Sequence, residues 1–132
     1  MHNTKQNIYL CIMIVENTQT QMRKGILEYC ILAVISRGEI YASDIISELK
    51  KAQLLVVEGT LYPLLTRLKN NGLLSYNWVE STSGPPRKYY KLTEAGAEVF
   101  KQLDKTWEEL VYAVDISTGR KESGNDTLKQ NG

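Results

Sequence analysis

Histidine and cysteine supply most nucleophilic triads and zinc sites, and this chain contains few of either. His2 is the only histidine, and Cys11 and Cys30 are the only cysteines. One histidine beside the first residue cannot serve a Ser/His/Asp or Cys/His triad, and these three residues do not provide the ligand set of a zinc site. The Asp and Glu residues are scattered and form no recognisable acid–base pair. The sequence therefore predicts no catalytic residues, no enzyme activity, no metal and no cofactor.

The charged residues are distributed unevenly along the chain, although their total is nearly balanced. The chain has 16 Lys and Arg residues against 15 Asp and Glu, which gives a net charge of +1. Between residues 58 and 93, five residues are basic and two are acidic, whereas between residues 94 and 117 six are acidic and two are basic. A molecule that docks on phosphate through one face shows such an asymmetry, because its cations gather on that face.

Length and composition indicate one globular domain. The chain has 132 residues, of which 42% are hydrophobic and 23% are charged, a mixture that can form a core. The apolar stretch at residues 8–15 is eight residues long, whereas a membrane-spanning helix needs about 20. We therefore expect a cytoplasmic protein with no membrane partner.

The N-terminal segment, residues 1–16, is predicted to lie outside the fold. Its apolar stretch gives way to Glu16-Asn17-Thr18, a change of character typical of a helix start, and Asn17 or Thr18 can cap such a helix. We favour a start of translation placed too early, with Met13 or Met22 as the true first residue, or a disordered segment. The alternative is a short additional strand or helix.

Hydrophobic spacing predicts three helices before residue 72. The first ends at Ser36 and is apolar on nearly every side in its second half, which indicates burial. The second covers residues 42–51. The third is the clearest, since leucines recur at i, i+3, i+4 and i+7: Leu61, Leu64, Leu65 and Leu68. Pro63 requires that this helix begin near Gly59 or Thr60, because only the first turn tolerates proline.

The period then changes from 3.6 to 2, which predicts a hairpin over residues 74–92. The turn-forming residues 81–86 are expected to make a six-residue tip, and Trp78 is expected to lie in the core beneath the hairpin. Thr93 is placed to cap a last helix, residues 94–116. Residues 117–132 are polar and lack an apolar period, so a disordered tail is expected.

Three helices followed by a hairpin form the order of a winged helix-turn-helix, here residues 17–93. In this arrangement the third helix enters the major groove of DNA and the hairpin lies along the adjacent backbone. If the leucine face turns inward, the opposite face can reach base edges and phosphates, and basic residues at the hairpin can contact phosphate. The alternative for each residue is an ordinary solvated surface. The predicted DNA contacts are Thr60, Tyr62, Pro63, Thr66, Arg67, Arg87 and Lys88.

Two segments resemble the PadR-like transcriptional regulators. One is EGTLYPLLTRL at 58–68 followed by NGLL at 71–74, and the other is GPPRKYYKLTEAG at 84–96. They are similar to the recognition helix and the wing of that family, and the similarity extends from Arg23 to about Val114. The resemblance implies a homodimeric repressor in which Thr60, Tyr62, Arg87 and Lys88 touch DNA. The extra N-terminal residues depart from the family pattern.

The last helix carries an apolar seam with spacings of 3, 4, 3 and 4 residues. A small winged domain has too little surface to cover this seam, so we expect a two-fold homodimer that reads a palindromic operator. The predicted dimer contacts are Phe100, Leu103, Trp107, Leu110, Val111 and Val114. The resemblance also implies a C-terminal dimerisation region, and a single helix corresponds to the short form of the family.

Trp107 has two interpretations. In short-form relatives, a tryptophan at the matching place lines a cavity at the dimer centre and stacks on flat aromatic ligands, which implies a ligand site here with Leu103 and Asp104 beside Trp107. The other interpretation is interface core, because large aromatic residues at helical spacing usually pack.

The sequence as a whole predicts a mainly α-helical protein with a β-hairpin, namely a winged helix-turn-helix with a long C-terminal dimerisation helix. Its predicted function is that of a homodimeric, sequence-specific DNA-binding repressor, released by a small aromatic effector. The alternative is a winged-helix adaptor that binds a protein and no specific DNA.

Overall fold

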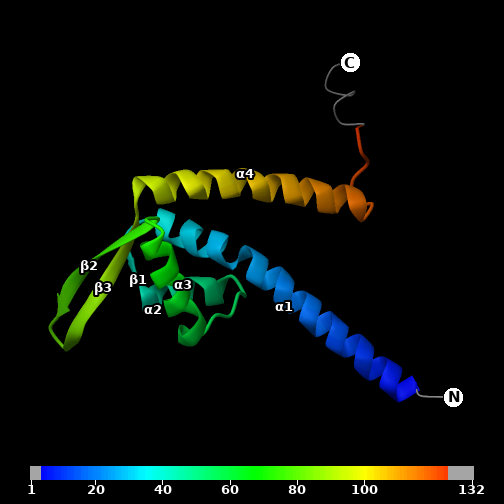
Figure 1. Cartoon of the computed structure of the whole chain (residues 1–132), viewed down its shortest axis with the longest axis horizontal. Helices are drawn as coiled ribbons and strands as arrows, with labels where there is room; N and C mark the ends of the chain where they lie inside the picture. Colours follow the sequence, from blue (N-terminus) through cyan, green and yellow to red (C-terminus); the bar gives the residue numbers. More distant parts are fainter. Residues whose placement is uncertain (1–3, 125–132) are drawn as a thin grey trace.

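The computed structural model describes residues 4–124, and Figure 1 shows the arrangement of their helices and strands. The elements follow the predicted order, with one short strand added before the second helix. They are α1 (Thr4–Ser36), β1 (Ile40–Tyr41), α2 (Ala42–Lys51), α3 (Glu58–Asn70), β2 (Leu74–Ser81), β3 (Gly84–Leu92) and α4 (Glu94–Ser117). The prediction of a mainly helical chain with a small antiparallel sheet is confirmed.

The core lies where the C-terminal half of α1 meets α2, α3 and the sheet. Ile31, Leu32 and Ile35 of α1 are buried, as the apolar second half of the predicted first helix required. Leu61, Leu65 and Leu68 of α3 join them, and Leu64 is partly buried beside the core. The leucine face of α3 therefore turns inward, as predicted.

Helix α1 begins earlier than the sequence predicts. Residues 4–16 continue the same helix, so the expectation of a disordered segment and of a cap at Asn17 or Thr18 differs from the structure. Residues 16–21 contain no glycine or proline that would end a helix. Thr20 donates its hydroxyl hydrogen bond back to the carbonyl of Glu16, as threonine does inside a helix. The position of the translation start stays a prediction.

The hairpin covers the predicted residues 74–92, but its strands are longer and its tip is tighter than predicted. Ser81 pairs with Gly84, so the turn has two residues and not six, and both prolines lie in β3. An irregularity between Val79 and Ser81 accommodates them. On its other edge, β3 pairs with β1 only at Tyr89 and Tyr90, so the prolines lack amide hydrogens where no partner strand needs them.

Helix α3 begins at Glu58, slightly before the predicted start, which places Pro63 inside the helix and beyond the first turn. The prediction that Pro63 lies among the first four helical residues is therefore wrong. The missing amide would have paired with the carbonyl of Gly59, which belongs to an exposed turn where water can replace the lost hydrogen bond.

The junction between the sheet and α4 is tightly built. Thr93 caps α4, as predicted, because its hydroxyl accepts a hydrogen bond from the amide of Gly96 at 3.0 Å. The same hydroxyl donates to the carbonyl of Gly72 at 2.6 Å. Gly96 is buried against the backbone of Leu73, so this end of α4 is fixed to the end of α3.

Helix α4 ends at Ser117, one residue beyond the predicted limit, and residues 118–124 follow as turns and bends. The remainder of the predicted tail, residues 125–132, lies outside the described residues. None of the helices within residues 4–124 is both long enough and apolar enough to cross a membrane.

Candidate nucleic-acid interface

Helix α3 presents its polar face outward. Thr60, Tyr62, Pro63 and Thr66 are exposed, because the three buried leucines occupy the opposite side of the helix. These are the residues that the sequence predicts as contacts on this helix, together with Arg67. The hairpin of β2 and β3, here called the wing, extends away from the helices (Figure 1).

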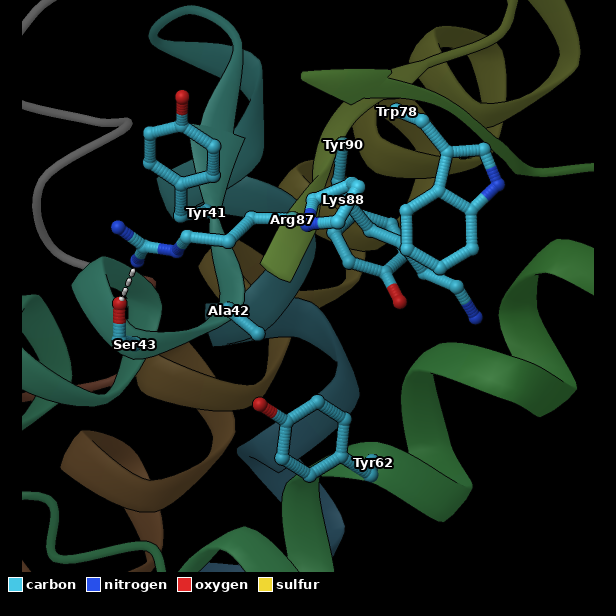
Figure 2. Close-up of a pocket in the computed structure, with 9 residues that line it drawn as sticks. Tyr41, Ala42, Ser43, Tyr62, Trp78, Arg87, Lys88 and Tyr90 are labelled. Atoms are coloured by element: carbon cyan, nitrogen blue, oxygen red, sulfur yellow. Dashed lines mark hydrogen bonds between the residues drawn. The ribbon is translucent and has the colours of Figure 1, made fainter. Parts of the chain in front are cut away.

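Arg87 of the wing is held in a defined direction. Its guanidinium lies 4.0 Å from the ring centre of Tyr41 and donates a hydrogen bond to the hydroxyl of Ser43 in α2 (Figure 2). Tyr41 in turn packs against Tyr89, with ring centres 4.7 Å apart. Tyr41 and Ser43 therefore hold the charge of Arg87 in place. Because Arg87 is exposed, this charge is also accessible to solvent.

Lys88 points toward aromatic rings on the other strand of the wing. Its ammonium nitrogen lies 4.5 Å from the ring centre of Tyr76 and 5.4 Å from that of Trp78. Lys69 of α3 approaches Tyr76 from the helix side, at 5.8 Å. Two cations, Lys69 and Lys88, and two rings therefore lie where α3 meets the wing.

Trp78 is 61% exposed, so its predicted place in the core is wrong. It shares a strand face with Leu74, which is buried, and with Tyr76, which is partly buried. The alternation of the strand was therefore correct, but the wing extends beyond the body, and the core no longer reaches the strand at residue 78 (Figure 1).

Two adjoining cavities separate α3 from the wing. The larger, of about 320 Å³, is lined by Tyr62 of α3 and by Arg87, Lys88 and Trp78 of the wing (Figure 2). The smaller, of about 90 Å³, is lined by Thr66, Lys69 and Asn70 of α3 and again by Lys88. Tyr90 borders both, and its burial raises the pKa of its phenol. The structure thus brings Tyr62, Thr66, Arg87 and Lys88 to one groove.

The other predicted residues on α3 lie differently. Thr60 and Pro63 are exposed on the helix and do not line either cavity. Arg67 lies toward α1, where its guanidinium forms an ion pair with the carboxylate of Glu28.

Several residues of this surface were missed by the sequence analysis: Tyr41, Ser43, Lys69, Tyr76 and Trp78. For Tyr76 and Trp78 the sequence did contain an indication, because aromatic residues of the first predicted strand and basic residues of the second face each other across the hairpin. Lys88 is paired with Trp78 in the register of β2 and β3. The contribution of β1 and α2 depends on a strand of two residues, which gives no readable period.

The predicted dimer seam on α4 divides into two parts. Phe100 and Leu103 are partly buried against the core of their own chain. Trp107, Leu110, Val111 and Val114 are exposed, on the part of α4 that extends past the body (Figure 1).

Tyr29 of α1 contacts two of the residues predicted to bind a ligand, Asp104 and Trp107. Its ring lies 5.9 Å from that of Phe100 and 6.3 Å from that of Trp107, and its hydroxyl donates a hydrogen bond to the carboxylate of Asp104. This hydrogen bond, with a smaller contribution from burial, raises the pKa of Tyr29 to about 12. The sequence analysis assigned no role to Tyr29.

Comparison with known proteins supports the winged fold. The family model described as the transcriptional regulator PadR-like family matches residues 31–102. A PadR-like transcription factor from Bacteroides fragilis is 62% identical, covering 75% of this chain and 96% of that one, with a TM-score of 0.65. A PadR family regulator from Eggerthella lenta is 28% identical, covering 88% and 99% of the two chains, with a TM-score of 0.76.

Bacillus subtilis PadR, whose structure was solved in complex with operator DNA, shares the fold at 24% identity. The match covers 70% of this chain and 60% of that one, with a TM-score of 0.55. The family model covers more than half of the chain, and the relative from Bacteroides fragilis adds a high identity over most of it. The chain therefore belongs to the PadR-like family of DNA-binding transcriptional regulators.

Proposed function

We propose that the chain is a cytoplasmic, homodimeric repressor that binds a palindromic operator through α3 and the wing. The observation that carries this proposal is the groove in which Tyr62 and Thr66 of α3 face Arg87 and Lys88 of the wing. The proposed contacts on the helix are Thr60, Tyr62, Pro63 and Thr66. The proposed contacts on the wing are Arg87 and Lys88, because phosphate recognition needs charge and reach.

The proposal of a dimer is supported by two apolar surfaces that extend past the body. On α4 the exposed residues are Trp107, Leu110, Val111, Tyr112 and Val114. On α1, residues 8–15 form an arm that is apolar on every side. At least half of the surface is exposed for each of the following residues of this arm: Ile8, Tyr9, Leu10, Ile12, Met13, Ile14 and Val15. A helix that is apolar all round requires burial from more than one side. A second copy placed on a two-fold axis supplies an α1 and an α4 for this purpose.

The proposed release of the repressor by a small aromatic molecule is supported by the surroundings of Trp107. The ring of Trp107 is exposed and lies beside Tyr29, with Leu103 and Asp104 on the same helix. Two such clusters, related by the dimer axis, would present flat apolar faces between which an aromatic ligand can stack. The contrasting proposal is that Trp107 packs against the partner as interface core.

The DNA-binding proposal is tested by mobility shift with the DNA upstream of the protein's own gene, at several salt concentrations. We expect a specific shift whose affinity falls steeply with salt. Arg87→Ala or Lys88→Ala should reduce the slope of log K against log salt by about 0.9 for each lost phosphate contact. Lys50→Ala, on the far end of α2, serves as the matched control and should leave the slope unchanged.

Two outcomes of the same assay speak against the proposal. Slopes unchanged in both wing variants would contradict the assignment of the wing. A wild-type protein that gives no specific shift near physiological salt would favour the winged-helix adaptor.

A further inference from the structure

Among the predicted DNA contacts, Arg67 is the one with an acidic partner within residues 4–124. Its guanidinium forms an ion pair with Glu28 of α1, and its side chain is 59% exposed. The partner is less accessible, because the Glu28 side chain is 39% exposed and its Oε1 atom is buried. The ion pair therefore joins the last turns of α3 to the C-terminal half of α1.

The burial of the carboxylate oxygen makes this pair more than a surface contact. A charged carboxylate oxygen removed from water is costly unless an opposite charge compensates it. Within residues 4–124, Oε1 of Glu28 accepts no hydrogen bond, so the ion pair with the Arg67 guanidinium is its compensation. Lys24 and Leu64 line the same cavity, of about 420 Å³. Moving Arg67 to a DNA phosphate would leave Glu28 without this partner.

The residue next to Glu28 on α1 contacts a different helix. Tyr29 stacks on Phe100 and lies beside Trp107, and its hydroxyl donates to Asp104 of α4. Two consecutive residues of α1 therefore hold the DNA-facing helix on one side and the aromatic cluster of α4 on the other. A rigid helix that contacts both elements is able to transmit a displacement between them.

We propose that Glu28 is a positioning residue that fixes α3 through Arg67, and that residues 28–29 couple the aromatic cluster of α4 to the DNA-facing surface. In this proposal the charge of Arg67 serves the orientation of the helix and does not neutralise a phosphate. The proposal rests on the DNA-binding function proposed above and names a regulatory connection within it.

The two roles of Arg67 differ in salt dependence. If Arg67 positions α3, Glu28→Gln and Arg67→Ala should each weaken specific DNA binding, by roughly 10-fold, with the salt slope unchanged. The double variant should be no weaker than either single variant, because both remove one interaction. The exchanged pair, Glu28→Arg with Arg67→Glu, should recover a large part of the affinity. Glu16→Gln, an exposed glutamate on the same helix, is the matched control.

The opposite pattern would overturn the proposal. If Arg67→Ala lowers the salt slope by about one contact while Glu28→Gln leaves the affinity unchanged, Arg67 contacts a phosphate. Failure of the exchanged pair to improve on Arg67→Glu alone would speak against positioning by this pair.

Amide hydrogen exchange tests the coupling without DNA, and so separates this proposal from the DNA-binding function. Glu28→Gln should speed exchange in the last turns of α3, and Tyr29→Phe, which removes the hydrogen bond to Asp104, should speed exchange at the same amides. Glu16→Gln, at an exposed position of the same helix, is the matched control. If Tyr29→Phe leaves α3 unchanged, the coupling through residues 28–29 is refuted, even if DNA binding is established.

Discussion

The cations of the wing are oriented by aromatic rings. Arg87 lies over Tyr41, and Lys88 lies near Tyr76 and Trp78. A cation over an aromatic ring at an exposed site gains about 0.5–1 kcal/mol, and the contact also limits the rotamers of a long side chain. A side chain that is already oriented loses less entropy when it binds a ligand. The aromatic residues of the wing therefore support the basic residues that we propose as phosphate contacts.

Trp78→Ala tests this support. We expect DNA binding to weaken by about 2- to 5-fold, because the ring near Lys88 is lost, while the free energy of unfolding changes by less than about 1 kcal/mol. Mobility shift and urea unfolding measure the two quantities. Leu65→Ala, at a fully buried position, is the contrasting variant and should cost about 2–5 kcal/mol of stability. A similar loss of stability in Trp78→Ala would mean that the tryptophan is part of the core.

The raised pKa of Tyr29 makes the stability of the fold depend on pH. Its pKa is raised from 10.0 to about 12 in the folded chain, chiefly by the hydrogen bond to Asp104. The folded state therefore holds the phenol proton more tightly than the unfolded state. The resulting stabilisation is fully present below pH 10 and is lost as the pH rises through about 12.

Chemical unfolding between pH 9 and pH 12 measures this dependence, in roughly the range that the raised pKa defines. Because other tyrosines titrate in the same range, the quantity compared is the difference between the wild type and Tyr29→Phe. That difference should shrink as the pH rises. A constant difference for Tyr29→Phe would show that the phenol proton does not contribute.

The helices that were predicted most accurately are those with a clear hydrophobic period or a clear cap in the sequence. The leucine repeat of α3 and the threonine cap of α4 define those helices because each reflects a local physical requirement, namely an apolar face or a partner for free amides. The start of α1 was missed because its polar residues 16–21 resemble a helix start and yet continue the helix. Four residues of the groove between α3 and the wing were predicted, namely Tyr62, Thr66, Arg87 and Lys88, whereas Lys69, Tyr76 and Trp78 were not. The contribution of Tyr41 and Ser43 was not, since it depends on tertiary pairing of a two-residue strand.

Gly96 of α4 lies tightly against the segment that joins α3 to β2. A Cβ atom at this position would lie 2.0 Å from the backbone oxygen of Leu73, which cannot move aside as a flexible side chain does. Gly96→Ala should therefore destabilise the fold by about 1–3 kcal/mol, as measured by thermal or urea unfolding.

Gly25 provides the matched control, because an added Cβ there meets no atom within 4 Å. It lies inside α1, so Gly25→Ala should stabilise the chain by about 0.5–1 kcal/mol through helix propensity. Equal effects of the two substitutions would contradict the tight contact between α4 and Leu73.

At the scale of the whole molecule, α1 and α4 are the elements that extend past the core (Figure 1). Tyr29 of α1 packs against Phe100 and Trp107 of α4. Beyond this contact the two helices diverge (Figure 1). Their exposed apolar residues therefore do not cover one another within a single chain. Residues 94–117, which form α4, carry a net negative charge, and residues 58–93, which include the proposed DNA contacts, carry a net positive one. The two regions therefore suit different partners.

Leu110→Asp tests whether a second copy covers the extended helices. In a two-fold dimer each interface carries the substitution twice, and a charge placed in an apolar contact without a partner is strongly unfavourable. We expect the dissociation constant of the dimer to increase by roughly 100-fold or more. Sedimentation velocity should show this change as a shift from the mass of two chains to that of one. Binding to an operator with two half-sites should weaken in parallel, since a monomer contacts one half-site at a time. Lys105→Gln lowers the charge by the same single unit at an exposed position of the same helix and should keep the dimer. A wild-type mass of one chain, or an unchanged mass in Leu110→Asp, would refute the proposed dimer interface.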